Sequence, residues 1–498
     1  MADMGYEMYR REDKNQLTMD AFMLPFDGQL LADNRWVRMS KLMPWDVVEE
    51  EYAKNMSEVD GRGALPARIA YGAIYIKEQE NLTDERTVEY LQENPYAQFF
   101  VGLKEFRKEA LFDSSLMVHF RKRFPTESIG RINEALHART HPKDTEPPMG
   151  ENNNDGKVPS DNISSNNGTL ILDATVAPSD IRYPTDLGLI NECRENTEKM
   201  IEELWEHSDK RGHKTSYSRK KARNAYLKIT KQKRPKKKAV QRVLLEQLGY
   251  VEKNLEKLNK LLAAVRYGVI SDADLFRLCT ICRVYRQQKE MADEGKNRCD
   301  DRIVNLRQPH VRCIVRGKAG APYEFGQKLH LSVVNGFTFL EYQSWDNFHE
   351  GVQLVDMVEQ YRQRFGVYPE AILADKIYRN RDNLRFCKEN GIRLSGPKLG
   401  RPPKEQNPLV QAQAYKDNCQ RNWIEGRNGI AKRRYGLDLI MSILPETAMT
   451  EAALNIVVMN VAHLLRMLFC LLRGAIISIF YHLNCVDINN FESKASFQ

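Results

Sequence analysis

The sequence of 498 residues has few cysteines and no long uncharged apolar run. Nine cysteines are an odd and thinly spread set, and we see no signal peptide, so we expect free thiols in a reducing compartment instead of a disulfide framework. Region 453–481 is apolar, but no uncharged stretch in it reaches the ~18 residues that a membrane helix needs. It predicts a buried helix, with a membrane helix as the minor alternative. The interrupting residues are Asn455, Asn460, His463, Arg466 and Arg473.

Acidic residues are missing from one long segment. Residues 210–238 contain fourteen Lys or Arg and no Asp or Glu, so subtracting these charges from the net charge of +8 leaves −6 on the remainder. A chain with all of its basic excess in one segment is typical of a protein that binds a polyanion through that segment. A solvated basic loop is the alternative.

The first part of the chain has the periodicity of helices. Residues 39–136 predict at least three short helices, and the one at 113–124 ends in a basic cluster of Arg121, Lys122 and Arg123. A helix-turn-helix DNA reader and an ordinary helical bundle both fit this pattern. Residues 1–30 lack periodicity. Pro, Asn, Asp, Ser and Gly dominate residues 138–168, which predicts a linker.

Helical periodicity returns after residue 187. Apolar residues recur at spacings of three and four through 187–265 on either side of the basic segment. We expect a helical hairpin with a positively charged tip, and a dimeric coiled coil is the alternative. Four later cysteines leave a zinc site open as a minor alternative to buried thiols. These are Cys279, Cys282, Cys299 and Cys313.

The remaining segments predict an α/β domain. Residues 169–176 form a short apolar run with Asp173 inside it. Asn335-Gly336 lies between two strand-like runs at 327–334 and 337–343, which is a strong hairpin signal. A helix, a strand at 371–374 that ends at Asp375, a helix at 380–390, a strand at 392–394 and a final helix follow. This order favours a mixed sheet flanked by helices.

The final helix presents an unusual face. At about 100° per residue, Arg421, Glu425, Asn428 and Lys432 fall within roughly 60° of one another, without an apolar residue among them. A carboxylate between two cations suits a metal that lies beside a phosphate backbone. A solvated helix with i,i+4 ion pairs is the alternative.

Three carboxylates can converge in such a sheet. A carboxylate inside a buried strand costs several kcal/mol unless a partner compensates it, so Asp173 needs a metal, a cation or a role. If the first and fourth strands are neighbours, Asp173 and Asp375 lie side by side, and a helix packed over them brings Glu425 close. Three carboxylates predict a site for two divalent metals that serves phosphoryl transfer. Arg379, Arg381, Arg421 and Lys432 supply cations for phosphates.

Asp173 and Asp375 also have an interpretation without a metal, as caps of turns. Asp173 could cap a turn at 174–179, which would leave Asp180 or Asp186 as the ligand. Asp375 could cap a turn at the end of its strand.

These motifs resemble those of the insertion-sequence DDE transposases. In that family's C-terminal signature, an Arg precedes the catalytic Glu by four residues and a Lys follows it by seven, as Arg421, Glu425 and Lys432 do here. Residues 172–176 and 373–379 resemble the two Asp motifs, residues 314–328 resemble the segment before the strand pair, and the N-terminal helices resemble the family's N-terminal domain. A Tyr usually stands three residues before the Arg, where this chain has Asn418.

The resemblance implies an α/β fold with an RNase H-like catalytic domain at 169–435, a helical N-terminal domain at 1–137 that binds DNA, and a helical C-terminal region at 436–498. The basic insertion at 187–300 follows the first strand. Asp173, Asp375 and Glu425 are then the catalytic and metal-binding triad for two Mg²⁺ ions, with Mn²⁺ as a substitute.

Function and partners follow from the same resemblance. We expect a prokaryotic, cytoplasmic and nucleoid-associated transposase that acts as a homodimer without a membrane. It would bind terminal inverted repeats and target DNA, and would cut and join strands. A DNA-binding descendant that no longer cuts is the alternative. Eight cations are expected to contact DNA phosphates: Arg421, Lys432, Arg379, Arg381, Lys220, Lys221, Lys236 and Lys237.

Overall fold

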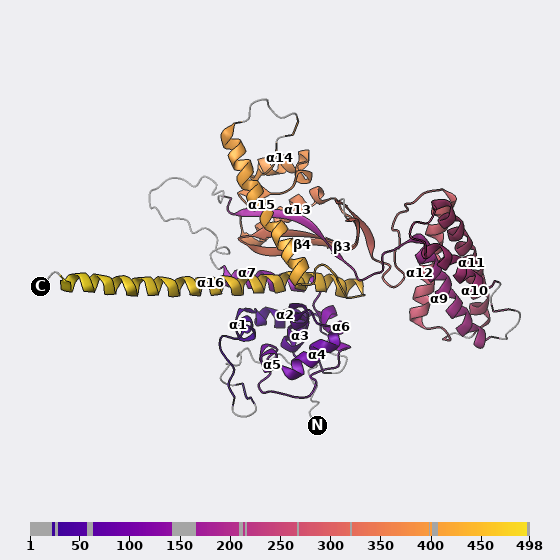
Figure 1. Cartoon of the computed structure of the whole chain (residues 1–498), viewed down its shortest axis with the longest axis horizontal. Coiled ribbons are helices and arrows are strands. Elements are labelled where there is room, and N and C mark those ends of the chain that lie inside the picture. Colours follow the sequence, from indigo (N-terminus) through magenta and orange to yellow (C-terminus); the bar gives the residue numbers. More distant parts are fainter. Residues whose placement is uncertain are drawn as a thin grey trace, which may run out of the picture.

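The computed structural model describes residues 22–24, 28–56, 63–141, 166–208, 213–214, 217–265, 268–318, 321–397, 399–400 and 407–495, the side chains up to Cys470. The expectations for residues 1–21 and for most of the linker at 138–168 lie outside this part of the chain. Within it, the protein is a mixed α/β structure rich in helices, as expected, and its sheet contains both parallel and antiparallel pairs (Figure 1).

Seven helices form the N-terminal part of the described chain. α3 is the centre of this group, because its side chains from Ile69 to Glu78 are buried on every side. Thr83 caps α4 by accepting a hydrogen bond from the Arg86 amide. The helices are α1 (Arg35–Leu42), α2 (Trp45–Lys54), α3 (Ala67–Glu80), α4 (Asp84–Glu93), α5 (Pro95–Phe100), α6 (Leu116–Arg123) and α7 (Thr126–Thr140).

The basic cluster at the end of α6 is not an open recognition surface. Arg121 is 5% exposed and forms a two-pronged ion pair with Asp84 at 2.8 and 2.7 Å. Arg123 donates a hydrogen bond to the Tyr52 hydroxyl at 2.7 Å. Two of the three cations therefore hold the helices together, which favours the helical bundle over a DNA reader built on this cluster.

Six strands form one sheet in the order β2-β3-β1-β5-β6, and β4 also pairs with β3. β1 runs antiparallel to β3 and parallel to β5, and β5 runs parallel to β6. The predicted strands at 169–176, 371–374 and 392–394 are confirmed, whereas β2 was not predicted. The strands are β1 (Thr169–Pro178), β2 (Arg312–Lys318), β3 (Ala321–Val334), β4 (Phe337–Ser344), β5 (Ala371–Leu373) and β6 (Arg393–Leu394).

The predicted hairpin joins β3 to β4. Asn335 and Gly336 both have positive φ, at 51° and 80°, which is the backbone that a two-residue hairpin turn requires. Val334 and Phe337 close the pair on either side. The Asn-Gly signal therefore fixed both the position and the register of this turn.

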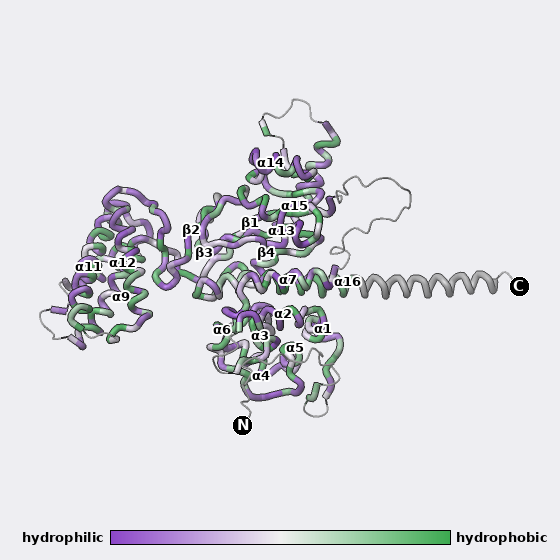
Figure 2. Tube along the Cα trace, turned by 180° about the vertical axis from the view of Figure 1, so that it is seen from behind, coloured by the Kyte–Doolittle hydropathy of each residue, from purple (hydrophilic) through white to green (hydrophobic). Residues whose placement is uncertain are grey.

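The basic insertion differs from the predicted hairpin. Four helices occupy it, α9 (Asp186–Glu206), α10 (Arg219–Thr230), α11 (Lys237–Ala264) and α12 (Asp272–Asp293), and α9, α11 and α12 share an apolar core. The described part of the basic segment is not a loop at a tip, because α10 buries Ala222 and Ile229 and packs against α11. Both views show the four helices standing beside the sheet (Figure 1 and Figure 2). The small apolar face of α10 is the feature that the charge pattern concealed.

One long helix joins the N-terminal helices to the sheet. α16 (Pro445–Ala495) contacts α3, α6 and α7 as well as β4 and α15 (Pro408–Arg434), and it crosses the molecule between the two groups (Figure 1). By length and composition, Pro445–Cys470 could span a membrane, but most of this stretch is packed inside the protein. The buried helix predicted for this region holds as far as Leu464, and Leu468 and Phe469 beyond it are exposed.

Candidate active site

One predicted aspartate lies within β1 and the other just after the neighbouring strand, β5. β1 pairs with β5 in parallel, with Ile171 opposite Leu373. Asp173 lies two residues further along β1, and Asp375 lies two residues beyond the end of β5, so the register brings the two residues next to each other. Because β1 continues to Pro178, Asp173 lies inside a strand, and its interpretation as the cap of a turn at 174–179 is wrong.

Asp173 lies in surroundings that disfavour its charge. Its pKa is raised to about 6, mainly by burial and also by the negative charges of Glu350 and Glu425, while a hydrogen bond from the Ala174 amide and the positive charge of Arg421 act in the opposite direction. The side-chain amide of Asn428 on α15 donates to Asp173 Oδ2 at 2.9 Å. The carboxylate is thus held by one side-chain donor in a negative field.

Asp375 and Glu425 each have a local partner. The Asp375 carboxylate accepts a hydrogen bond from the Lys376 amide at 2.7 Å and caps a single turn of 3₁₀ helix, η4 (Lys376–Tyr378). Glu425 is exposed and forms an i,i+4 ion pair with Arg421 at 3.2 Å. The turn-capping interpretation of Asp375 and the ion-pair interpretation of Glu425 are therefore both confirmed.

The carboxylates do not form a closed ligand set. Among the described residues, no group of three or more His, Cys, Asp or Glu side chains is close enough to hold a metal ion. Each of the three carboxylates instead takes a nearby donor: Asn428, the Lys376 amide or Arg421. The carboxylates themselves offer oxygen ligands, the type that Mg²⁺ prefers, so the residues fit that ion in their chemistry, although they are not gathered around a single point.

Glu350 belongs to no motif and was not predicted as a site residue. This residue begins η3 (Glu350–Val352), which follows β4, and its carboxylate pairs with Lys328 of β3 at 2.9 Å. Gly351 lets η3 approach η4 closely, because a Cβ there would lie 2.5 Å from the Ile377 carbonyl oxygen. Glu350 thereby acts on Asp173 through its charge.

A buried pair supports the turn that carries Asp375. Tyr378, at the end of η4, is fully buried, and its hydroxyl hydrogen-bonds His330 of β3. Burial lowers the pKa of His330 to about 3, so this imidazole is neutral. Asn383 Nδ2 donates to the carbonyl groups of Tyr378 and Gly351 at 2.8 and 2.7 Å. These bonds hold η3 and η4 together beneath the carboxylates.

The predicted phosphate ligands differ in how the protein uses them. Lys432 lies 3.8 Å from Glu324 of β3, which also pairs with Arg316 at 3.0 Å. Arg379 donates to the carbonyl oxygens of Leu394 and Ser395, both at 2.7 Å.

Arg379 thus holds the end of β6, which argues against its predicted role as a phosphate ligand. The other predicted ligands outside α15 are exposed: Arg381, Lys220, Lys221, Lys236 and Lys237.

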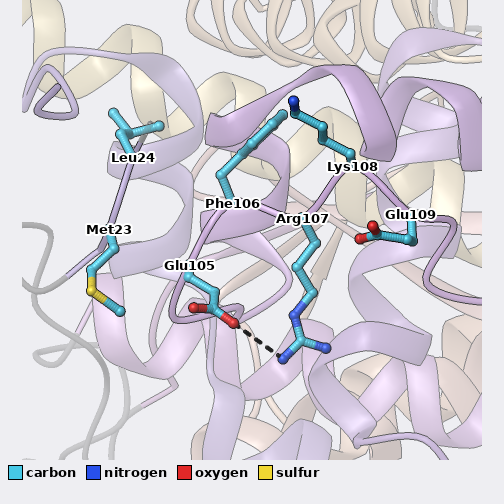
Figure 3. A pocket seen from close by; sticks show the side chains of 7 residues that line it. All are labelled: Met23, Leu24, Glu105, Phe106, Arg107, Lys108 and Glu109. Atoms are coloured by element: carbon cyan, nitrogen blue, oxygen red, sulfur yellow. Dashed lines mark ion pairs between the residues drawn. The ribbon is translucent and has the colours of Figure 1, made fainter. Parts of the chain in front are cut away.

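Asp186, Cys279 and one surface pocket lie apart from the three carboxylates. Asp186, once an alternative ligand, pairs with Arg302 and accepts a hydrogen bond from Gln288 at 2.9 Å. Cys279 on α12 is exposed, contrary to the expectation of a buried thiol. A surface pocket between residues 23–24 and 105–109 is lined by no predicted site residue (Figure 3).

Comparisons with known proteins identify the family of this chain. A family model described as "Transposase DDE domain" matches residues 372–462, which include Asp375 and Glu425, and one described as "Transposase domain (DUF772)" matches residues 25–123. The uncharacterized protein ORF8 in the nfe locus of Rhizobium meliloti is 31% identical over 194 residues, 39% of this chain and 82% of that protein. No solved structure matches. These matches show that the chain belongs to the insertion-sequence DDE transposases.

Proposed function

We propose that this transposase binds the terminal inverted repeats of its own element, cuts at the element ends and joins the exposed 3′-hydroxyl groups to target DNA. The observation that carries the proposal is the position of Asp173 on β1 and of Asp375 just after the neighbouring parallel strand β5, with the Glu425 helix bonded to Asp173 through Asn428. Residues from three distant parts of the chain meet there.

The strand order supports an RNase H-like catalytic domain. Without β2, the sheet reads β4-β3-β1-β5-β6, with an antiparallel hairpin on one side of β1 and parallel strands on the other. α15 contacts both β1 and β5 and so covers the strands that carry the two aspartates. We place this domain at residues 169–435, with the helical insertion after its first strand.

Asp173, Asp375 and Glu425 are proposed to hold two Mg²⁺ ions, or Mn²⁺ in their place. Bound there, the ions would activate a water or a 3′-hydroxyl and stabilise the leaving oxygen. The protein supplies the rest: Asn428 orients Asp173, and Arg421 and Lys432 are placed to hold the substrate phosphates. Arg421 would exchange its bond with Glu425 for a phosphate when DNA binds.

DNA affinity is proposed to come from two helical parts. The N-terminal helices would contribute to recognition of the ends, and the exposed lysines of α10 and of the start of α11 would bind the DNA backbone. Two ends must be held together, so we propose a homodimer on DNA. Such a protein would act in the cytoplasm, associated with the nucleoid of a prokaryote.

The test is cleavage of a labelled duplex that carries the element's end, with Mg²⁺ or with EDTA. We expect Mg²⁺-dependent nicking by the wild type and none by Glu425→Gln. The control is Glu256→Gln, because Glu256 is an exposed carboxylate on α11 that belongs to neither the triad nor the basic segment.

A DNA-binding descendant that no longer cuts is the second candidate. Asn418, in place of the Tyr usual in the signature, and the open arrangement of the three carboxylates favour it. Tight binding to the duplex without nicking, equal in wild type and Glu425→Gln, would select this candidate.

A further inference from the structure

Asn428 makes a contact with Asp173 that the proposed roles of the three carboxylates do not require. It lies three residues after Glu425 on α15, is 8% exposed, and donates its Nδ2 hydrogen to Asp173 Oδ2 at 2.9 Å. Three residues along a helix keep a side chain on nearly the same face. Asn428 and Glu425 therefore approach β1 together.

The helix is fixed in the rotation that makes this contact. Ile424 and Ala431, on either side of Asn428, are fully buried in the core. Arg427 donates to the carbonyl oxygen of Gly336 in the β3–β4 turn. Apolar packing and this hydrogen bond set the rotation of α15 independently of Asp173. The packing of the helix, and not the contact with Asp173 alone, therefore places Asn428 beside the carboxylate.

The side-chain oxygen of Asn428 has no hydrogen-bond donor among the described residues. This oxygen, Oδ1, is buried. An amide has two donors and an acceptor, and an ionised aspartate can only accept, so Nδ2 must face Asp173 and Oδ1 is left over. A buried acceptor without a donor costs about 1–3 kcal/mol. A purely structural contact would be expected to avoid this cost.

We infer that Asn428 is a positioning residue for a cation at Asp173: Nδ2 fixes one carboxylate oxygen and leaves the other available, while Oδ1 accepts a hydrogen bond from the water shell of the ion. This inference rests on the proposed function, because it concerns the same ion. Residues of this kind, outside the direct ligands, typically contribute about 10- to 100-fold in metal affinity.

Calorimetric titration of the full-length chain with Mn²⁺ tests the inference without relying on activity. Asn428→Leu has nearly the same shape and removes both the donor and the acceptor. Asn428→Asp keeps an oxygen and removes the donor. Asn422→Leu makes the matched change at an exposed position of the same helix. Asp173→Asn identifies the heat that belongs to this site. Two controls show whether a variant is merely misfolded. One is the free energy of unfolding measured without metal, and the other is the affinity for DNA measured in EDTA.

We expect Asn428→Leu to bind Mn²⁺ about 10- to 100-fold more weakly, with unchanged DNA binding in EDTA. Asn428→Asp should lose less, because it retains an oxygen, and Asn422→Leu should match the wild type. Mn²⁺ affinity within twofold of wild type in Asn428→Leu would overturn the inference. Equal losses in Asn428→Leu and Asn428→Asp would overturn the role of Oδ1. Failure of the wild type to show any Asp173-dependent heat would instead overturn the proposed function.

Discussion

Arg421 lies one helical turn before Glu425 on α15, and its guanidinium holds the Glu425 carboxylate at 3.2 Å. Both side chains are partly exposed, so the pair contributes at most about 1 kcal/mol to stability. Under the proposed function, a DNA phosphate would replace Glu425 as the partner of Arg421, and the freed Glu425 would become available to a metal ion.

Replacement of Arg421 by Ala should separate activity from stability. We expect the nicking rate on an end-bearing duplex to fall by about 10²-fold, because a cation aimed at the reacting phosphate is lost. The free energy of unfolding should change by less than about 1 kcal/mol. The control is Arg362→Ala, which removes a more exposed i,i+3 pair with Glu359 on α13 (Leu354–Phe365) together with a hydrogen bond to Tyr368. Equal nicking by Arg421→Ala and wild type would contradict this role.

Asp173→Asn should stabilise the metal-free protein at neutral pH. Burial raises the Asp173 pKa from 3.8 to about 6, so the folded state favours the protonated form. The stability associated with this protonation is present below pH 4 and is lost as the pH rises through 6, whereas Asn does not ionise. In EDTA, we therefore expect a gain of up to about 3 kcal/mol at pH 8 that disappears near pH 4. Denaturant unfolding across pH measures it, and a gain independent of pH would contradict the explanation.

The lysines of the basic segment should set the salt dependence of DNA binding. Each phosphate contact contributes about 0.9 to the slope of log affinity against log salt concentration. Lys220→Gln/Lys221→Gln, and likewise Lys236→Gln/Lys237→Gln, should reduce this slope by about 2. Lys253→Gln/Lys260→Gln is the matched control, because both residues are exposed on α11 outside the segment. An unchanged slope in both test variants would exclude this segment from the DNA interface.

Asn460→Ala should weaken the connection between the N-terminal helices and the sheet. Asn460 on α16 is fully buried; it donates to Asn133 of α7 at 3.0 Å and to the Thr338 carbonyl of β4 at 2.7 Å, and it accepts from the Thr338 amide. Ala would leave several buried groups unpaired, and we expect a loss of about 2–4 kcal/mol in denaturant unfolding. Asn422→Ala, at an exposed position, should lose almost nothing, and a similar loss there would argue against the network.

The strands and the signature helix were predictable because their signals are local. Apolar runs that end in turn residues identified β1 and β5, and the Asn335-Gly336 pair identified the hairpin. The position of Asp173 beside Asp375 also followed, since it needs only the order of the strands. Helical spacing placed Glu425 and Asn428 on one face.

What could not be predicted depends on contacts between distant segments. Glu350 reaches Asp173 because Gly351 packs closely against η4, and neither residue stands in a motif. The fold of α10 rests on two buried side chains among many lysines, so its charge pattern suggested an open tip. Arg379 was expected to bind phosphate because it is a cation next to a catalytic motif, yet two carbonyl groups of the β6 end engage it.

The position of α16 determines when, during synthesis, the N-terminal helices and the sheet can pack together. Its buried stretch, from Thr447 to Leu464, lies between helices and strands that are all synthesised before it. A growing chain on the ribosome therefore holds the N-terminal helices and the sheet before the segment that packs them together. Until α16 emerges, apolar surfaces on both groups stay uncovered, and only direct contacts such as those of α7 with β4 hold the N-terminal helices to the sheet. The packing between the two groups is therefore completed after both have been synthesised.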